Sequence, residues 1–74
     1  MANRVHTWRW WEIDKAILKL NDEFELVESQ EYDRYKDAKK AWDALSKTTG
    51  VSHFFCRVTR LQNGELDSET LASK

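Results

Sequence analysis

Residues 33–64 read DRYKDAKKAWDALSKTTGVSHFFCRVTRLQNG, and this stretch decides the predicted fold. Its first half predicts an amphipathic helix from about Asp33 to Thr48, because apolar residues recur at the i, i+3, i+4 and i+7 spacing of a core-facing stripe. The stripe consists of Tyr35, Ala38, Ala41, Trp42 and Leu45. Asp33 suits the N-cap, and Gly50 stands where a left-handed residue commonly follows a helix end.

A strand from Val51 to Leu61 is predicted directly after this helix, because two sets of residues alternate along it. The set that we expect to be buried is Phe54, Cys56 and Val58. The opposite set is His53, Phe55, Arg57 and Thr59. Asn63-Gly64 follows, and this dipeptide is a strong signal for a tight hairpin turn. We therefore expect a short returning arm, with loose polar residues 68–74 at its end.

The N-terminal third of the chain is rich in aromatic and β-branched residues. After four loose residues, the stretch from Val5 to Ile13 predicts a strand. Residues 14–28 fit either a helix or a hairpin with a three-residue loop at 21–23. We favour the hairpin, because a helix would place Lys15 at the positive end of its dipole and Glu28 at the negative end. The cross-strand pairs of the hairpin would be Leu20 with Phe24, Leu18 with Leu26, and Lys19 with Glu25.

The predicted fold class is α+β, with a mostly antiparallel sheet of four to five strands and one amphipathic helix packed on one face. The 74 residues suffice for a single domain, 1–74, and a domain of this size buries only about 60% of the surface that its unfolded chain exposes. Cys56 is the one cysteine, so no internal disulfide supplements the core. The lone thiol and the lack of an apolar run of about 18 residues favour a cytoplasmic protein.

Candidate catalytic and metal-ligating residues are sparse. A nucleophile needs a base beside it, but alternation places Cys56 and His53 on opposite faces of their strand. Zinc needs three or four ligands, and apart from carboxylates the sequence offers only His6, His53 and Cys56. Gly50 and Gly64 stand alone and form no phosphate-binding loop. We predict no enzyme activity, no cofactor and no bound metal.

Four tryptophans point to a partner surface. Alternation puts Trp8 and Trp10 on one face of the first strand, and Arg9 and Trp11 on the other. Because one helix covers only one face of the sheet, at least one tryptophan should lie near solvent, where tryptophan is enriched at binding hot spots. The alternative is that a terminal segment folds over them. The predicted partner-binding residues are Trp8, Trp10 and Phe55 as apolar anchors, with Arg9 and Arg57 as charges at the rim.

Charges are segregated along the chain, although the net charge is only −1. Residues 12–33 hold eight acids and two lysines, whereas residues 34–60 hold seven bases and two acids. The favoured interpretation is that the two segments neutralise each other in the fold. The alternative is a basic binding face, whose candidate nucleic-acid contacts are Lys36, Lys39, Lys40 and Lys47. Nucleic-acid binders usually carry a strong basic excess, which this chain lacks.

The function favoured by the sequence is a small non-catalytic protein-binding module, a regulator or inhibitor of a larger protein of the type that phages and mobile elements encode. This expectation rests on the small size of the chain, its many aromatic residues and the lack of a recognisable catalytic or metal site. No sequence motif supports it. The alternative is a nucleic-acid-binding module that uses the basic helix face and an open aromatic sheet. A homodimer through the uncovered sheet face is compatible with both, and no membrane partner is expected.

Overall fold

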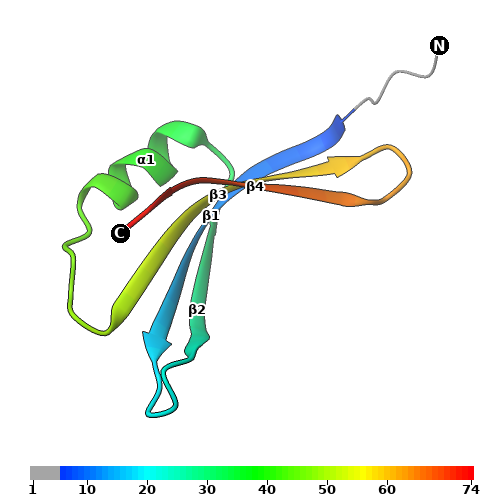
Figure 1. The fold of residues 1–74 in the computed structure, drawn as a ribbon. Helices are drawn as coiled ribbons and strands as arrows, with labels where there is room; N and C mark the ends of the chain where they lie inside the picture. Colours follow the sequence, from blue (N-terminus) through cyan, green and yellow to red (C-terminus); the bar gives the residue numbers. More distant parts are fainter. Residues whose placement is uncertain (1–5) are drawn as a thin grey trace.

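A computed structural model describes residues 6–74 as a four-stranded antiparallel sheet with one short helix lying on it (Figure 1). The elements are β1 (His6–Leu18), β2 (Phe24–Tyr32), α1 (Tyr35–Asp43), β3 (Val51–Leu61) and β4 (Leu66–Ser73). Their order in the sheet is β2-β1-β3-β4, so β2 and β4 are the edges. The predicted α+β class is confirmed, with four strands. No helix in this described range is long and apolar enough to cross a membrane.

Strand β1 is one continuous element of 13 residues, where the sequence predicted a strand and then the first arm of a hairpin. Residues 11–17 pair with β2 on one side and with β3 on the other. The backbone groups of this segment are therefore satisfied on both sides, which favours one unbroken strand. Val5 and the predicted loose residues 1–4 lie outside the described residues.

The hairpin predicted over residues 14–28 is confirmed, but its register differs by two residues. The observed pairs at its end are Leu18 with Phe24, Ile17 with Glu25, and Ala16 with Leu26. The loop therefore has five residues, 19–23, and Leu20 lies at its tip instead of in a cross-strand pair. Inside the loop, Asp22 adopts φ of 66°, a left-handed conformation that aspartate tolerates better than most residues. The conformation of this loop sets the register of the hairpin, which the apolar pattern alone did not predict.

Helix α1 is shorter at both ends than the predicted range of 33–48. Arg34, not Asp33, occupies the N-cap, and no side chain caps the helix there. At the other end, Ala44 is the C-cap, and the serine, lysine and threonines that follow are poorer helix formers than the alanines before them. Gly50 has a positive φ of 79°, as expected, but it belongs to the turn that enters β3 and not to the helix end.

Strand β4 is longer than the short arm that the sequence predicted, and residues 68–73, expected to be loose, belong to it. Next to it, the backbone of Lys74 exchanges two hydrogen bonds of 2.9 Å with His53. The Lys74 ammonium donates to the carbonyl oxygens of Trp42 at 2.7 Å and Leu45 at 3.0 Å, and lies 4.9 Å from the Trp42 ring centroid. Because the last carbonyls of a helix lack partners within it, this lysine both caps α1 and ties it to the sheet.

The core lies between α1 and the middle of the sheet, where Ile13 and Phe55 meet Ala38 and Trp42. The rings of Phe55 and Trp42 are stacked, with centroids 5.5 Å apart and planes inclined by 18°. Tyr35 closes the N-terminal side of this aromatic group, with its ring centroid 6.1 Å from that of Phe55. Aromatic packing therefore supplies much of the core of a very small domain.

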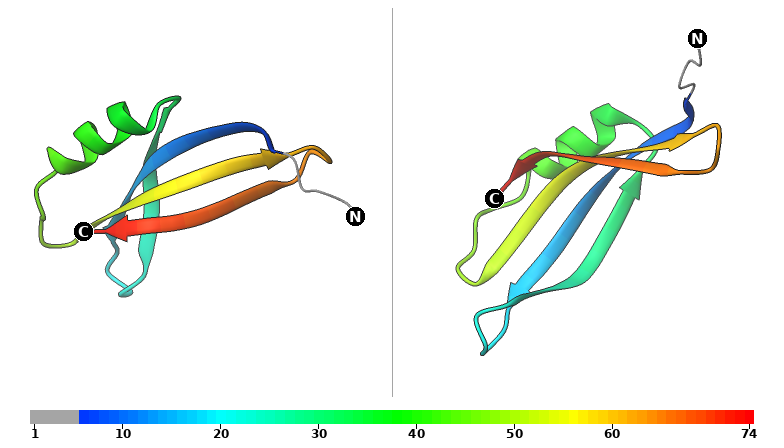
Figure 2. Two further views of the ribbon diagram at one scale, coloured as in Figure 1. Left: turned by 90° about the horizontal axis from the view of Figure 1, so that it is seen from above. Right: turned by 45° about the vertical axis from the view of Figure 1, so that its right-hand side comes forward.

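Cys56 and Val58, which the sequence predicted to be buried, are buried, but not by the helix. The helix covers the face of β3 that carries Phe55, whereas Cys56 and Val58 lie on the uncovered face. Residues of both faces are nevertheless buried, with Phe55 at 3% and Val58 at 4% exposure, because β3 is a central strand and the sheet is twisted and curved (Figure 2). Alternation predicts which residues share a face, but it does not choose the face that a single helix covers when both carry apolar residues.

Candidate partner-binding surfaces

The predicted tryptophan surface is only partly exposed. Trp8 is 54% exposed and lies opposite Arg60 of β3. Trp10 is 9% exposed, and its indole N–H donates to the Glu12 carboxylate at 3.1 Å. Phe55 is buried under the helix, so the expectation that it extends this patch is wrong. Of the three predicted anchors, Trp8 is the one that a partner could reach without unfolding the domain.

The two predicted rim charges lie on the other face of the sheet from Trp8. The Arg9 guanidinium donates from Nε to the Thr59 hydroxyl at 3.2 Å. Arg57 forms an ion pair with Glu69 across the β3–β4 ladder. Arg9 and Arg57 both line a polar cavity of about 430 Å³ near the β3–β4 turn, and Leu61 and Asp67 line it as well. The five predicted partner-binding residues therefore do not form one site.

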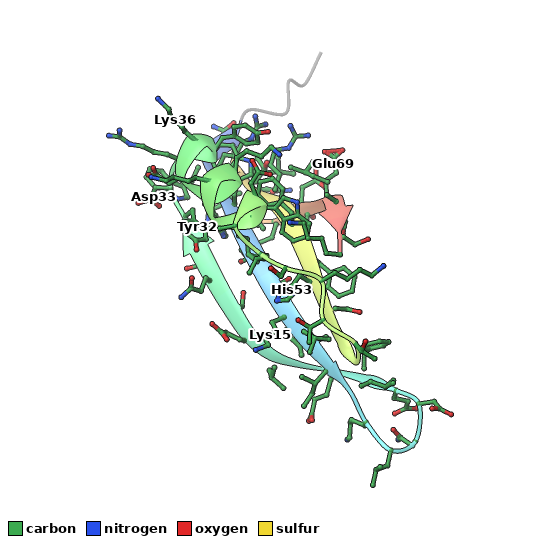
Figure 3. All side chains as sticks on the ribbon, turned by 90° about the vertical axis from the view of Figure 1, so that its left-hand side faces the viewer. Lys15, Tyr32, Asp33, Lys36, His53 and Glu69 are labelled. Atoms are coloured by element: carbon green, nitrogen blue, oxygen red, sulfur yellow. The ribbon has the colours of Figure 1, made fainter. Side chains whose placement is uncertain are left out.

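The predicted lysine face is dispersed. Lys36 and Lys40 are exposed on α1, and Figure 3 shows Lys36 projecting from the outer side of the helix. Lys39 donates to the Asp43 carboxylate at 2.7 Å, and this hydrogen bond raises the pKa of Lys39. Lys47 lies beyond the end of the helix, in the connection to β3. The lysines lie on the helix side of the sheet, whereas the exposed tryptophan lies on the uncovered side, so they share no surface.

A surface that the sequence did not single out carries most of the exposed apolar groups. Among residues 8–74, six of the ten exposed large hydrophobic side chains lie within residues 17–27, at the loop end of the β1–β2 hairpin. We call these six residues the hairpin surface: Ile17, Leu18, Leu20, Phe24, Leu26 and Val27. Leu20 at the tip is completely exposed, and Leu26 is 60% exposed. Figure 1 shows this hairpin projecting beyond α1.

Element lengths explain why the hairpin surface is left uncovered. Helix α1 has nine residues and is therefore roughly 14 Å long, whereas the 13 residues of β1 span roughly 40 Å. The molecule accordingly measures 48 Å along its longest axis. One short helix covers only the middle of such a sheet. The apolar residues of the hairpin are thus left in solvent on both faces, with Leu18 on the uncovered face and Ile17 on the helix side.

Acidic side chains surround the hairpin surface. Within residues 17–28 the exposed acids are Asp22, Glu23, Glu25 and Glu28, against one exposed lysine, Lys19. We expected the basic segment 34–60 to neutralise the acidic segment 12–33. The ion pairs Lys39–Asp43 and Arg57–Glu69 lie outside the hairpin and do not involve these acids. The hairpin therefore combines apolar side chains with a local excess of negative charge.

Groups capable of covalent or metal chemistry are not assembled within the described residues. Cys56 is buried, as predicted, and its Sγ lies 3.9 Å from an Asp14 carboxylate oxygen and 3.8 Å from the Thr70 hydroxyl. Burial, which outweighs the opposing hydrogen bond with Thr70, raises the pKa of this thiol. His53 is on the opposite face, also as predicted. No three His, Cys, Asp or Glu side chains of this part of the chain could hold a metal ion, and the side chain of His6 lies outside it.

Comparison with known proteins adds no relative. No protein-family model, no curated protein and no solved structure matches the chain. The function is therefore argued from the surfaces described above.

Proposed function

We propose that this chain is a small non-catalytic protein-binding module that regulates or inhibits a larger protein, of the type that phages and mobile elements encode. The observation that carries the proposal is the hairpin surface. Exposed apolar side chains that gather on one face often mark partner sites, and Leu18, Phe24 and Leu26 share the uncovered face of the hairpin. Leu20, Phe24 and Leu26 are each at least half exposed and lie within seven residues of one another in the sequence.

The charge around the hairpin surface defines the chemistry of the partner. A complementary protein offers an apolar groove bordered by lysine or arginine, because opposite potentials steer association and like charges oppose it. The acids of the hairpin also disfavour nucleic acid at this end, since phosphates would be repelled. Two copies of the chain that met hairpin to hairpin would bring the same acids together, so a basic partner is favoured over a homodimer.

Strand β2 adds a second means of attachment. It is an edge strand, and every residue of it except Tyr32 has an exposed side chain. The outer edge of β2 presents backbone N–H and C=O groups that can pair with a strand of the partner, a mode in which main-chain hydrogen bonds give affinity and alternate side chains give specificity. The acidic residues along β2 protect this edge against indiscriminate pairing.

The test is affinity capture of binding proteins with the tagged chain and two matched variants, before and after nuclease treatment. Leu20→Asp changes the completely exposed hairpin tip, and Leu66→Asp makes the same change at a 60% exposed position of β4. We expect one dominant protein that survives nuclease, that Leu66→Asp retains, and that Leu20→Asp loses. Equal capture by Leu20→Asp would contradict the hairpin site. Loss of all partners with nuclease would favour the nucleic-acid alternative and its lysines.

A further inference from the structure

A cavity of about 320 Å³ lies on the uncovered face of the sheet, at the end opposite the hairpin surface. Trp8 and Trp10 both line it, because residues two apart on β1 share a face. Glu31 of β2 and Asp33, which Figure 3 shows where β2 ends and α1 begins, line it on one side of β1. Arg60 of β3, opposite Trp8, lines it on the other side. One cavity therefore combines two indole rings with two carboxylates.

The two indole rings differ in their freedom to move. Trp10 is buried, and its N–H donates to the Glu12 carboxylate at 3.1 Å, so this ring is held in one orientation. Trp8 is more than half exposed, and it is the largest apolar side chain that residues 8–74 leave in solvent. A ligand in this cavity meets one ring that is already fixed, so only the ring of Trp8 has to be ordered on binding.

Acidic groups outnumber basic groups around the two rings. Glu31 and Asp33 line the cavity together with one base, Arg60. Glu12, which holds the ring of Trp10, is directly opposite Glu31 on the paired strands β1 and β2. Like charges in directly opposite positions destabilise a sheet, and a cation between them reduces this repulsion. The local excess of negative charge therefore attracts a cation to the rings and opposes the entry of an anion.

We propose that this cavity binds a quaternary ammonium group, with choline as a simple ligand of this class. The face of an indole ring is electrostatically negative, and tryptophan attracts a cation within about 6 Å more strongly than the other aromatic residues do. The cation lies against the two indole rings, and the carboxylates of Glu31 and Asp33 neutralise its charge. A cavity of about 150 Å³ holds benzene, so one of about 320 Å³ has room for choline, which has about one more heavy atom.

The aromatic walls select a quaternary ammonium group among cations of similar size. A primary ammonium group is a compact and strongly hydrated charge, so its transfer from water to an aromatic wall costs more free energy than the transfer of a methylated cation. An uncharged ligand of the same shape gains the apolar contact but no attraction to the carboxylates or to the ring faces. This ligand is independent of the protein partner that we propose for the hairpin surface.

The test is an NMR titration of the full labelled chain with choline chloride at constant ionic strength, read at the indole N–H signals of Trp8 and Trp10. We expect saturable shifts with a dissociation constant on the order of 10 mM. Two analogues should each bind about tenfold more weakly. They are ethanolamine, which has a primary ammonium group, and the uncharged isostere of choline, in which carbon replaces the nitrogen.

Two variants and one control assign the binding to this cavity. Trp8→Leu keeps an apolar side chain but has no aromatic face, so it should weaken choline binding about tenfold. Asp33→Asn removes one negative charge and should weaken choline binding about threefold. Glu65→Gln removes the same charge at an exposed position outside the cavity, between β3 and β4, and should leave the dissociation constant unchanged. The amide spectrum of each variant checks that it is folded.

Three results would overturn the assignment. The first is the absence of a saturable shift up to about 200 mM choline. The second is binding of the uncharged isostere as tight as that of choline, which would make the cavity a simple apolar patch. The third is unchanged choline binding by the folded Trp8→Leu variant. None of these experiments alters the hairpin surface, so their failure is distinct from a failure of the proposed function.

Discussion

Two phenylalanines in the same chain allow a matched test of which surface is core and which is free. Phe55 is 3% exposed and stacked on Trp42, whereas Phe24 is 54% exposed on the hairpin. Replacing each with alanine removes the same atoms from two different environments. The free energy of unfolding should therefore fall far more for Phe55→Ala than for Phe24→Ala.

The magnitudes follow from burial. Loss of a buried phenylalanine side chain costs about 3–5 kcal/mol, including the cavity it leaves. Full burial of such a side chain is worth about 2–3 kcal/mol, so the half-exposed Phe24 contributes about 1 kcal/mol and leaves no cavity. With an m-value of about 1 kcal/mol/M in urea, the unfolding midpoint should drop by about 3–5 M for Phe55→Ala and about 1 M for Phe24→Ala.

The assay is urea unfolding followed by tryptophan fluorescence. A domain of this length has a total stability of roughly 4–11 kcal/mol, so Phe55→Ala can leave no folded protein to measure. Phe55→Leu keeps most of the volume and should cost about 1–2 kcal/mol, which stays within range. Equal losses for Phe24→Ala and Phe55→Ala would refute the reasoning, because the hairpin would then be packed against something in the free protein.

Three further substitutions test the supports of the fold. Lys74→Ala should cost about 1–2 kcal/mol in urea unfolding, because it removes two bonds to helix carbonyls and the contact with Trp42, whereas Lys36→Ala on the outer helix face should cost almost nothing. Gly50→Ala should cost about 1 kcal/mol through its positive φ alone, since an added Cβ meets no described atom within 4 Å; an unchanged midpoint would contradict this. The raised pKa of Cys56 means that the native state holds the thiol proton more tightly, so its contribution to stability is complete below about pH 8.5 and declines as the pH rises toward the folded value. The free energy of unfolding of the wild type relative to Cys56→Ala, measured in urea, should therefore be smaller at pH 10 than at pH 7. The thiol should also react slowly with iodoacetamide at pH 7.

Local sequence patterns predicted which helix and strands form more accurately than they predicted the residues at which these elements begin and end. The spacing of Ala38, Ala41 and Trp42 identified the helix, and Asn63-Gly64 identified the β3–β4 turn. The register of the first hairpin was missed because it depends on the conformation of its loop, including the left-handed Asp22, and not on the apolar pattern.

The candidate site was harder to predict than the fold. Alternation placed Trp8 and Trp10 on one face, but only contacts in three dimensions distinguish the exposed Trp8 from Trp10, which is buried beside Glu12. The hairpin surface was missed for a different reason. Leucine and phenylalanine in a strand predict burial by default, and they remain exposed here because α1 is too short to reach them. The sequence pattern alone does not indicate how far along the strands the helix covers the sheet.

The most direct test of binding at the hairpin is an amide map of the labelled chain with and without its captured partner. Hydrogen exchange, read residue by residue, reports which backbone groups the partner covers. The proposal predicts protection or signal loss over residues 17–27, and no change at Trp8 or at the helix lysines Lys36 and Lys40. Protection centred on Trp8 would move the site to the tryptophan end of the sheet, and protection of the lysine-bearing helix face would contradict an acidic, hairpin-based binding module.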